Sequence, residues 1–209
     1  RRLQVCVGSV RFCITRLEDA LAAAEFGADA IGLVFYKKSP RYVPPAVAAS
    51  IIAQLPPFIS TVGLFVNEST DEIKQILDIV PLDLLQFHGS EVEPECSCYN
   101  RPYIKAVAMK PGLNVTEVVN QYPSAQGILL DTYDVVLPGG TGKSFDWSKV
   151  PRNLSKPIIL AGGLTPENIR EAVDVVHPWA VDVSGGVEES KGKKDHRLIQ
   201  AFIEGVHRV

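Results

Sequence analysis

Short apolar stretches alternate with amphipathic ones along the whole chain. The apolar stretches are rich in Val, Ile and Leu, as buried parallel strands are, and they end near Ile14, Phe35, Val66, Phe87, Val107, Asp131, Ala161 and Val183. The amphipathic stretches predict helices over Leu17–Phe26, Pro45–Gln54, Thr70–Ile79, Val115–Gln121, Glu167–Asp174 and Arg197–Val206. The helical patterns after Phe87 and Asp131 are weaker. Thr165, Pro166 and Glu167 predict an N-cap followed by a first helical turn.

Eight strand-then-helix units within 209 residues predict an α/β fold, a single (β/α)8 TIM barrel over residues 1–209. A doubly wound parallel sheet is the alternative. Both architectures place the active site at the carboxyl ends of the strands. The residues that end the predicted strands are therefore the first candidates for function.

Two glycine pairs close the last two predicted strands and predict a phosphate site. A pair of this kind on its own is more often a structural turn. In a barrel, however, the loops after the seventh and eighth strands often offer backbone N–H groups to a phosphate. We therefore expect an anion to be bound by Gly162, Gly163, Ser184, Gly185 and Gly186. A long glycine-rich loop, residues 139–147, also follows the sixth strand.

Cys13 and Asp131 are the ionisable candidates for chemistry at strand ends. A strand-end cysteine is usually a small apolar residue, whereas an unpaired aspartate closing an apolar strand is costly. A thiol and a carboxyl facing one cavity suit a transfer with one acid and one base. Arg41, after the second strand, either pairs with a substrate carboxylate or is a solvated loop charge. His88, after the fourth strand, either lines the pocket or is a hydrogen-bonded structural histidine.

Charge and composition argue against several classes of binding partner. A net charge of −3 argues against nucleic acid or an anionic membrane as a partner, and no apolar run reaches the roughly 18 residues of a membrane helix. The four cysteines form no disulfide framework, which favours a cytoplasmic protein. We expect no metal, because Cys96 and Cys98 lack a second ligand pair. The lysines at 191, 193 and 194 are most simply a solvated stretch.

The residues resemble the phosphoribosylanthranilate isomerase family of tryptophan biosynthesis over nearly the full chain. The motifs that carry the resemblance are Ile14-Thr15-Arg16 with Glu18-Asp19-Ala20, Gly27-Ala28-Asp29, Ser39-Pro40-Arg41, Gly63-Leu64-Phe65-Val66-Asn67, Leu85-Gln86-Phe87-His88-Gly89, Asp131-Thr132, the loop ending in Phe145-Asp146-Trp147, Ala161-Gly162-Gly163-Leu164 and residues 181–188. The resemblance implies an Amadori rearrangement of a phosphosugar without a cofactor, in a monomer or homodimer. It also implies Cys13 as general base, Asp131 as general acid, Arg41 on the anthranilate carboxylate and the glycine loops on the phosphate.

The first strand departs from the family pattern, which reads Lys, apolar, Cys, Gly, Ile, Thr. Here Arg11-Phe12-Cys13-Ile14-Thr15 lacks the glycine, and Cys6 is a rival for the strand-end thiol. For the two roles at neutral pH, an aspartate needs a pKa raised from about 3.9 and a thiol a pKa lowered from about 8.5. Two other functions stay open: the histidine-pathway sugar isomerase, whose family carries aspartate in place of Cys13, and a catalytically silent phosphosugar-binding barrel.

Overall fold

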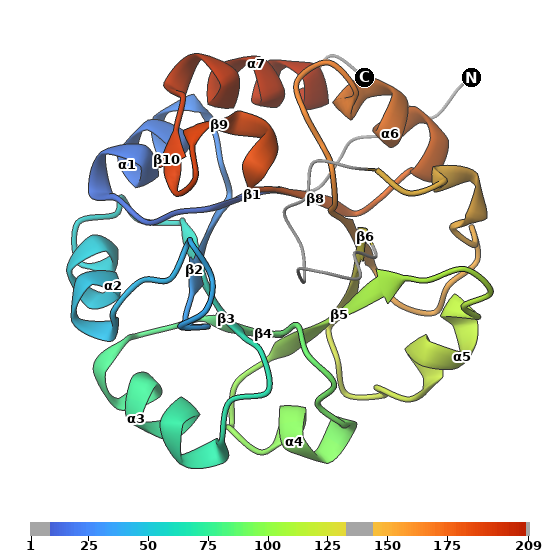
Figure 1. Ribbon diagram of the computed structural model, residues 1–209, viewed down its shortest axis with the longest axis horizontal. Helices are drawn as coiled ribbons and strands as arrows, with labels where there is room; N and C mark the ends of the chain where they lie inside the picture. The colour runs from blue at the N-terminus through green and yellow to red at the C-terminus, as the bar shows by residue number, and fades with distance from the viewer. Residues whose placement is uncertain (1–8, 133–143, 208–209) are drawn as a thin grey trace.

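Eight parallel strands form a closed barrel in the computed structural model, which describes residues 9–132 and 144–207. The strands follow one another around the barrel in chain order, and the helices lie outside them (Figure 1). Their bounds are β1 Ser9–Cys13, β2 Ala30–Val34, β3 Ser60–Phe65, β4 Leu84–Phe87, β5 Tyr103–Met109, β6 Gly127–Thr132, β7 Ile158–Leu160 and β8 Ala180–Val183. The prediction of a (β/α)8 barrel is confirmed, and a doubly wound sheet is excluded because β1 pairs with β8.

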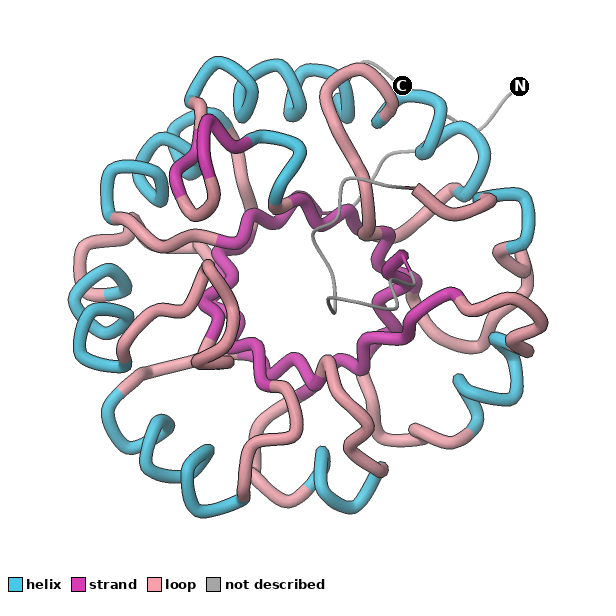
Figure 2. Tube along the Cα trace, in the orientation of Figure 1, coloured by secondary structure: helices cyan, strands magenta, loops and turns pink. Residues whose placement is uncertain are grey.

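The helices form the outer ring in Figure 2. They are α1 Leu17–Phe26, α2 Pro45–Ile52, α3 Thr70–Ile79, α4 Glu93–Ser97, α5 Val115–Asn120, α6 Ile169–Val176 and α7 His196–His207. Helices α1 and α3 match their predicted bounds, and residues at their ends explain why. Gly27 ends α1 with φ +106°, a left-handed conformation that favours glycine, and Ser69 and Glu72 form a capping box at the start of α3. None of the helices in the described part of the chain is long and apolar enough to cross a membrane.

The predicted N-cap of α6 is wrong. The helix begins at Ile169, two residues after the predicted start. Asn168 shapes the turn before it, because its side chain accepts from Thr165 N at 2.8 Å and donates to Gly163 O at 2.8 Å. Thr165 instead hydrogen-bonds the side chain of Glu167 and lowers its pKa. The turn therefore holds the end of the glycine loop in place before the helix starts.

A short hairpin follows β8 where a solvated stretch was predicted. A 3-10 turn, η2 Gly185–Val187, leads into strands β9 Glu188–Ser190 and β10 Lys193–Lys194. The hairpin lies against α1, since Lys194 N donates to Asp19 at 3.1 Å (Figure 1). The Lys194 side chain is fully buried, so the solvated reading of this residue is wrong. Residues 133–143, which include the first five residues of the glycine-rich loop, lie outside the described residues, and the 3-10 helix η1 Trp147–Lys149 ends that connection.

Alternation along each strand separates the core between barrel and helices from the barrel interior. Phe12 faces outward, where its ring meets Phe202 of α7 edge-on at 5.9 Å between centroids. Its neighbours Arg11 and Cys13 point to the opposite face. Part of the interior is apolar, filled by Ile104, Ala106, Leu129 and Ala161. Toward the carboxyl ends of the strands the interior becomes polar, and this polar end is the mouth of the barrel.

Candidate active site

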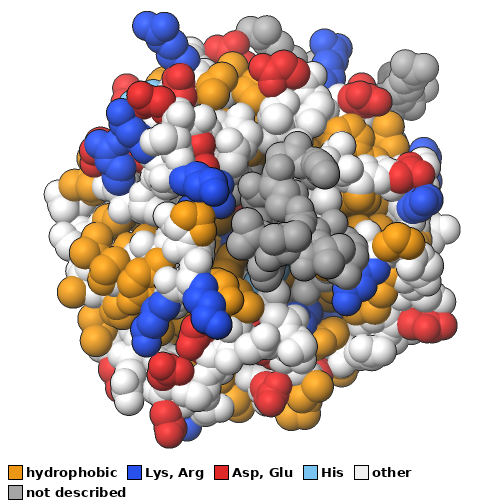
Figure 3. Space-filling view, in the orientation of Figure 1, with side chains coloured by type: hydrophobic (Ala, Val, Ile, Leu, Met, Phe, Trp, Pro, Cys, Tyr) orange, Lys and Arg blue, Asp and Glu red, His pale blue; other side chains and the backbone are white. Residues whose placement is uncertain are grey.

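The predicted site residues all lie at the mouth. Cys13 ends β1, Asp131 is the penultimate residue of β6, and His88 follows β4. Arg41 lies in the loop between β2 and α2. One pocket at the mouth brings Asp131 together with both glycine loops, including Gly162, Gly163, Ser184, Gly185 and Gly186. Around the rim, basic and acidic side chains are interspersed (Figure 3).

The glycine loops are shaped for a close backbone approach. Gly162 and Gly163 have φ of +81° and +66°, and a Cβ on Gly162 would clash with Thr132. A Cβ on Gly186 would clash with the carbonyl of Leu164. Ser184 Oγ is buried and has no hydrogen-bond partner among the described residues. A buried hydroxyl left without a partner is costly, and a ligand oxygen in this pocket would satisfy it.

The Cys13 thiol faces the barrel interior. A Cβ on Gly32 of the neighbouring strand would lie 3.5 Å from its Sγ. Burial raises the pKa of Cys13, Asp182 raises it further, and the nearby cations Arg11, Lys194 and Arg41 oppose the rise without reversing it. The pKa of Cys13 in the free protein is therefore raised, in the direction opposite to the one that favours a base at neutral pH. Cys6, the rival thiol, lies outside the described residues.

Sequence reasoning missed a buried polar layer beneath the mouth. Arg11 donates from Nε and Nη2 to the two carboxylate oxygens of Asp182 at 2.9 and 2.5 Å, and from Nη1 to Gln86 Oε1. Burial by itself would lower the pKa of Arg11, but Asp182, Cys13 and Asp131 together outweigh burial and raise it. Gln86 Nε2 lies 2.8 Å from His88 Nδ1, and His88 Nε2 lies 3.1 Å from Asp131 Oδ2. Hydrogen bonds thus connect the buried ion pair to Asp131.

Arg41 is paired with an acidic side chain and is not a solvated charge. Its Nε and Nη2 donate to the carboxylate of Glu188 at 2.7 and 2.6 Å. Lys194 Nζ donates to the same carboxylate at 3.0 Å and to Ser184 O at 2.8 Å. Burial would raise the pKa of Glu188, but Arg41 and Lys194 outweigh it and lower the pKa. Two cations around one carboxylate leave this cluster with one formal positive charge.

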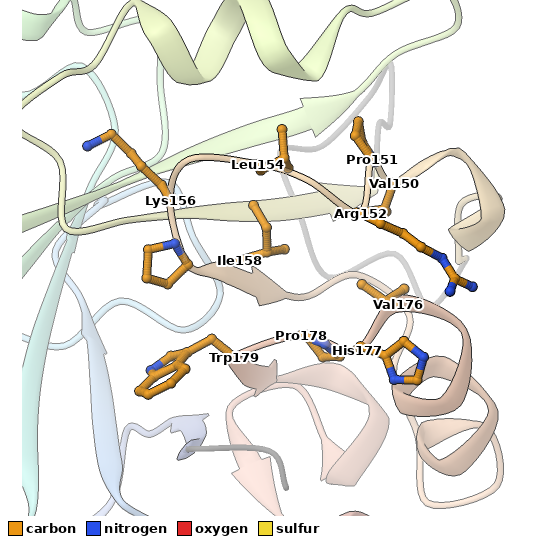
Figure 4. Close-up of a pocket in the computed structure, with 11 residues that line it drawn as sticks. Val150, Pro151, Arg152, Leu154, Lys156, Ile158, Val176, His177, Pro178 and Trp179 are labelled. Atoms are coloured by element: carbon orange, nitrogen blue, oxygen red, sulfur yellow. The ribbon is translucent and has the colours of Figure 1, made fainter. Parts of the chain in front are cut away.

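A second pocket, wider than the one at the mouth, lies at the opposite end of the barrel. Its walls come from the segments before β7 and β8, with Arg152 and His177 toward one side and Lys156 and Trp179 toward the other (Figure 4). The Lys156 ammonium is occupied by two backbone carbonyls, Pro123 O and Ala125 O. Since barrels place chemistry at the carboxyl ends of strands, we assign the site to the mouth.

The remaining cysteines and histidines are dispersed. Cys96 is buried and Cys98 is exposed, so their thiols have different surroundings. Burial raises the pKa of Cys96 to about 12. His196 contacts Asp19 at 2.9 Å, and His177 is the C-cap residue that follows α6. Within residues 9–132 and 144–207, no group of three His, Cys, Asp or Glu side chains is placed to hold a metal ion.

The Glu188 cluster predicts an acid-sensitive contribution to stability. Glu188→Gln should lower the free energy of unfolding at neutral pH by about 3–5 kcal/mol, because it leaves two largely buried cations without their carboxylate. The folded-state pKa of Glu188 is depressed, so its contribution is present above the unfolded pKa of about 4.3. The difference between parent and variant should shrink as pH falls through the folded pKa. Denaturant unfolding at several pH values measures it.

Glu189→Gln is the matched control. Glu189 pairs at 2.7 Å with Lys193, but both side chains are about half exposed, and such pairs contribute less than about 1 kcal/mol. Equal losses in the two variants at neutral pH would contradict the role given to the buried cluster.

Comparisons with known proteins agree with one another. The family model described as N-(5'phosphoribosyl)anthranilate (PRA) isomerase matches residues 11–205. An N-(5'-phosphoribosyl)anthranilate isomerase of Pseudomonas fluorescens (strain Pf0-1) is 64% identical over 193 residues, covering 92% of this chain and 95% of the relative.

Two solved structures extend the likeness to the fold. The phosphoribosyl anthranilate isomerase of Thermotoga maritima superposes with a TM-score of 0.88 at 43% identity, covering 96% of this chain and 99% of that one. A second isomerase structure, in complex with reduced 1-(o-carboxyphenylamino)-1-deoxyribulose 5-phosphate, has a TM-score of 0.84 and 42% identity, with coverage of 96% and 99%. Because the family model matches residues 11–205 of its 209, the chain belongs to the N-(5'-phosphoribosyl)anthranilate isomerase family.

Proposed function

We propose that the barrel mouth isomerises N-(5-phosphoribosyl)anthranilate to 1-(2-carboxyphenylamino)-1-deoxyribulose 5-phosphate in tryptophan biosynthesis, with Asp131 as general acid and Cys13 as general base. The observation that carries this assignment is the shared pocket of Asp131 and the two glycine loops. Cys13 ends β1, which pairs with β8, a strand whose end lines that pocket, and its thiol faces the interior.

The reaction proceeds in two proton transfers. Asp131 donates a proton to the ring oxygen of the ribose, the bond from that oxygen to C1′ breaks, and the anthranilate nitrogen forms a Schiff base with C1′. Cys13, as thiolate, then removes the proton from C2′ to give an enolamine, which tautomerises to the ketone. One acid and one base suffice, and the chemistry needs no cofactor.

Different groups bind the phosphate and the carboxylate of the substrate. Backbone N–H groups of the glycine loops and Ser184 Oγ bind the phosphate, as strand-end loops of barrels do. Arg41 binds the anthranilate carboxylate with Nη1, since its hydrogen bonds to Glu188 use Nε and Nη2. The single positive charge of the Arg41, Glu188 and Lys194 cluster favours an anion at that end.

The proposed enzyme is a monomer or a homodimer, and its proposed location is the cytoplasm. Every site residue named above comes from one chain, which supports a monomer or a homodimer with one complete site in each subunit, and light scattering measures which. The free thiols of Cys13, Cys96 and Cys98 support a cytoplasmic location. We also assign His88 to the substrate pocket, through its contact with Asp131.

Removing either proton-transfer group should lower kcat far more than it changes KM. General acid or base catalysis contributes about 10²–10⁴-fold, so we expect losses of that size for Asp131→Asn and Cys13→Ser. The decay of substrate fluorescence measures turnover, and Cys98→Ser, an exposed thiol, serves as control. If Cys13→Ser alone leaves turnover unchanged, Cys6→Ser is the next measurement, and full activity in all three site variants would refute the acid and base assignment. Assaying the histidine-pathway aminoaldose in parallel tests the other isomerase activity.

Ser184→Ala should weaken the binding of a phosphate-bearing product analogue by roughly 10–150-fold, since one hydrogen bond to a charged group contributes about 1.5–3 kcal/mol. It should leave the free energy of unfolding unchanged or slightly higher, because the orphaned buried hydroxyl is gone. Gly185→Val should weaken binding more, since its bulk enters a site built from backbone N–H groups. Calorimetry measures both, and parent-like affinity in Gly185→Val would rule the phosphate site out.

The pH dependence of kcat/KM should reflect the raised pKa of Cys13 in the free enzyme. The base acts only when deprotonated, so kcat/KM should still be rising with pH above the ordinary thiol value of about 8.5. The Cys13→Ser variant should lack this rise. A parent profile that is flat from pH 7 upward would contradict the thiolate as base.

A further inference from the structure

His88 bridges Gln86 and the proposed acid with both of its ring nitrogens. Nδ1 lies 2.8 Å from Gln86 Nε2, and Nε2 lies 3.1 Å from Asp131 Oδ2. A ring turned over by 180° would present carbon atoms to both partners and lose both hydrogen bonds. The orientation of the imidazole is therefore determined by its two neighbours.

Arg11 decides the direction of these hydrogen bonds. A guanidinium carries only donors, so the amide atom of Gln86 that faces Arg11 Nη1 must be its oxygen. The amide nitrogen then faces His88 and donates to Nδ1, which has to accept. The hydrogen of a neutral imidazole consequently lies on Nε2, and His88 donates it to Asp131 Oδ2.

The backbone on either side of His88 is held separately. The buried Lys105 ammonium donates to Phe87 O at 3.2 Å and to Gly89 O at 2.8 Å. It also pairs at 3.2 Å with Glu91, whose carboxylate accepts from Gly89 N at 2.9 Å. The histidine thus projects from a fixed backbone position into a fixed set of hydrogen bonds.

We propose that Gln86 is a positioning residue that sets the His88 tautomer, so that His88 donates to Asp131 Oδ2 and fixes the orientation of the carboxyl group. This proposal rests on the role of Asp131 as general acid. Oδ2 accepts the His88 hydrogen at 3.1 Å and Oδ1 accepts from Thr132 N at 2.7 Å, so a donor holds each oxygen of the Asp131 carboxyl group. Oδ1 faces the first glycine loop, since a Cβ on Gly162 would lie 2.7 Å from it. The carboxyl group is thus held at the pocket that Asp131 and Gly162 share.

The tautomer is measurable without substrate. Long-range ¹H–¹⁵N correlation spectra of the ¹⁵N-histidine-labelled protein distinguish a protonated from an unprotonated ring nitrogen, and His88→Asn assigns the signal. We expect His88 with hydrogen on Nε2 in the parent and on Nδ1 in Gln86→Glu, because a carboxylate at position 86 accepts where the amide donated. Hydrogen on Nδ1 in the parent would overturn the proposal whatever the kinetics.

Kinetics separate positioning from packing. Gln86→Glu should lower kcat by roughly 10²-fold with little change in KM, the size expected when a reacting group is misplaced by about 1 Å. Gln86→Met keeps the volume, removes the donor and imposes no opposite tautomer, so its loss should be smaller, roughly tenfold. Arg11→Lys keeps a donor toward Gln86 and should retain the parent tautomer. Gln126→Glu, an exposed position, controls for the added charge.

The outcomes test the positioning role of Gln86 separately from the role of Asp131 as general acid. A changed His88 tautomer in Gln86→Glu with parent kcat would refute the positioning role while leaving the acid assignment standing. A larger kcat loss in Gln86→Met than in Gln86→Glu would mean that Gln86 matters only for packing. Full activity of Asp131→Asn would remove the acid assignment, yet the spectra would still report how Gln86 directs His88.

Discussion

The ion pair between Arg11 and Asp182 is the contact on which the mouth of this barrel depends. Both side chains are less than a tenth exposed, and an isolated charge in such a place costs several kcal/mol, so neither can be buried without the other. The two residues stand opposite each other in the β1–β8 pairing, which is the seam that closes the barrel. A one-residue slip of this pairing would turn Arg11 toward the apolar layer under the helices. The pair therefore fixes the register of the seam, and the third guanidinium nitrogen orients Gln86 above it.

A second buried cation, Lys194, organises the rim of the mouth next to β1 and β8. Lys194 reaches from the hairpin to the carbonyl of Ser184 in one glycine loop and to Glu188, which holds Arg41. Burial lowers the pKa of Lys194, and Glu188 opposes that shift. Asp19 of α1 anchors the hairpin through Lys194 N and His196. The group proposed for the phosphate and the group proposed for the carboxylate are thus braced by one side chain, which keeps their separation constant.

The strands, most helices and the mouth residues could be predicted because they follow from local periodicity and from the rule that strands end at the site. The deeper polar layer was missed although alternation indicates it: Arg11, Gln86 and Asp182 each stand two positions before Cys13, His88 and Ser184, and so face the same interior. Lys194 is different. Its neighbours in sequence are exposed lysines, and only contacts with Asp19 and Ser184, distant in sequence, bury it. The raised pKa of Cys13 was likewise beyond reach, since it depends on how much water the finished barrel excludes.

The seam also has a consequence for how the chain acquires its shape during synthesis. Asp182, the partner of Arg11, lies 171 positions further along the chain. At about 5–20 residues per second, the ribosome adds Asp182 roughly 9–34 s after Arg11. Throughout that interval the first strand carries a guanidinium that cannot be buried, so β1 must stay solvated while the middle units gather around their own apolar residues. Closure of the ring is then a late event, triggered by the arrival of Asp182. A nascent chain halted before that point would be an open sheet with two unpaired edges, the kind of species that chaperones retain.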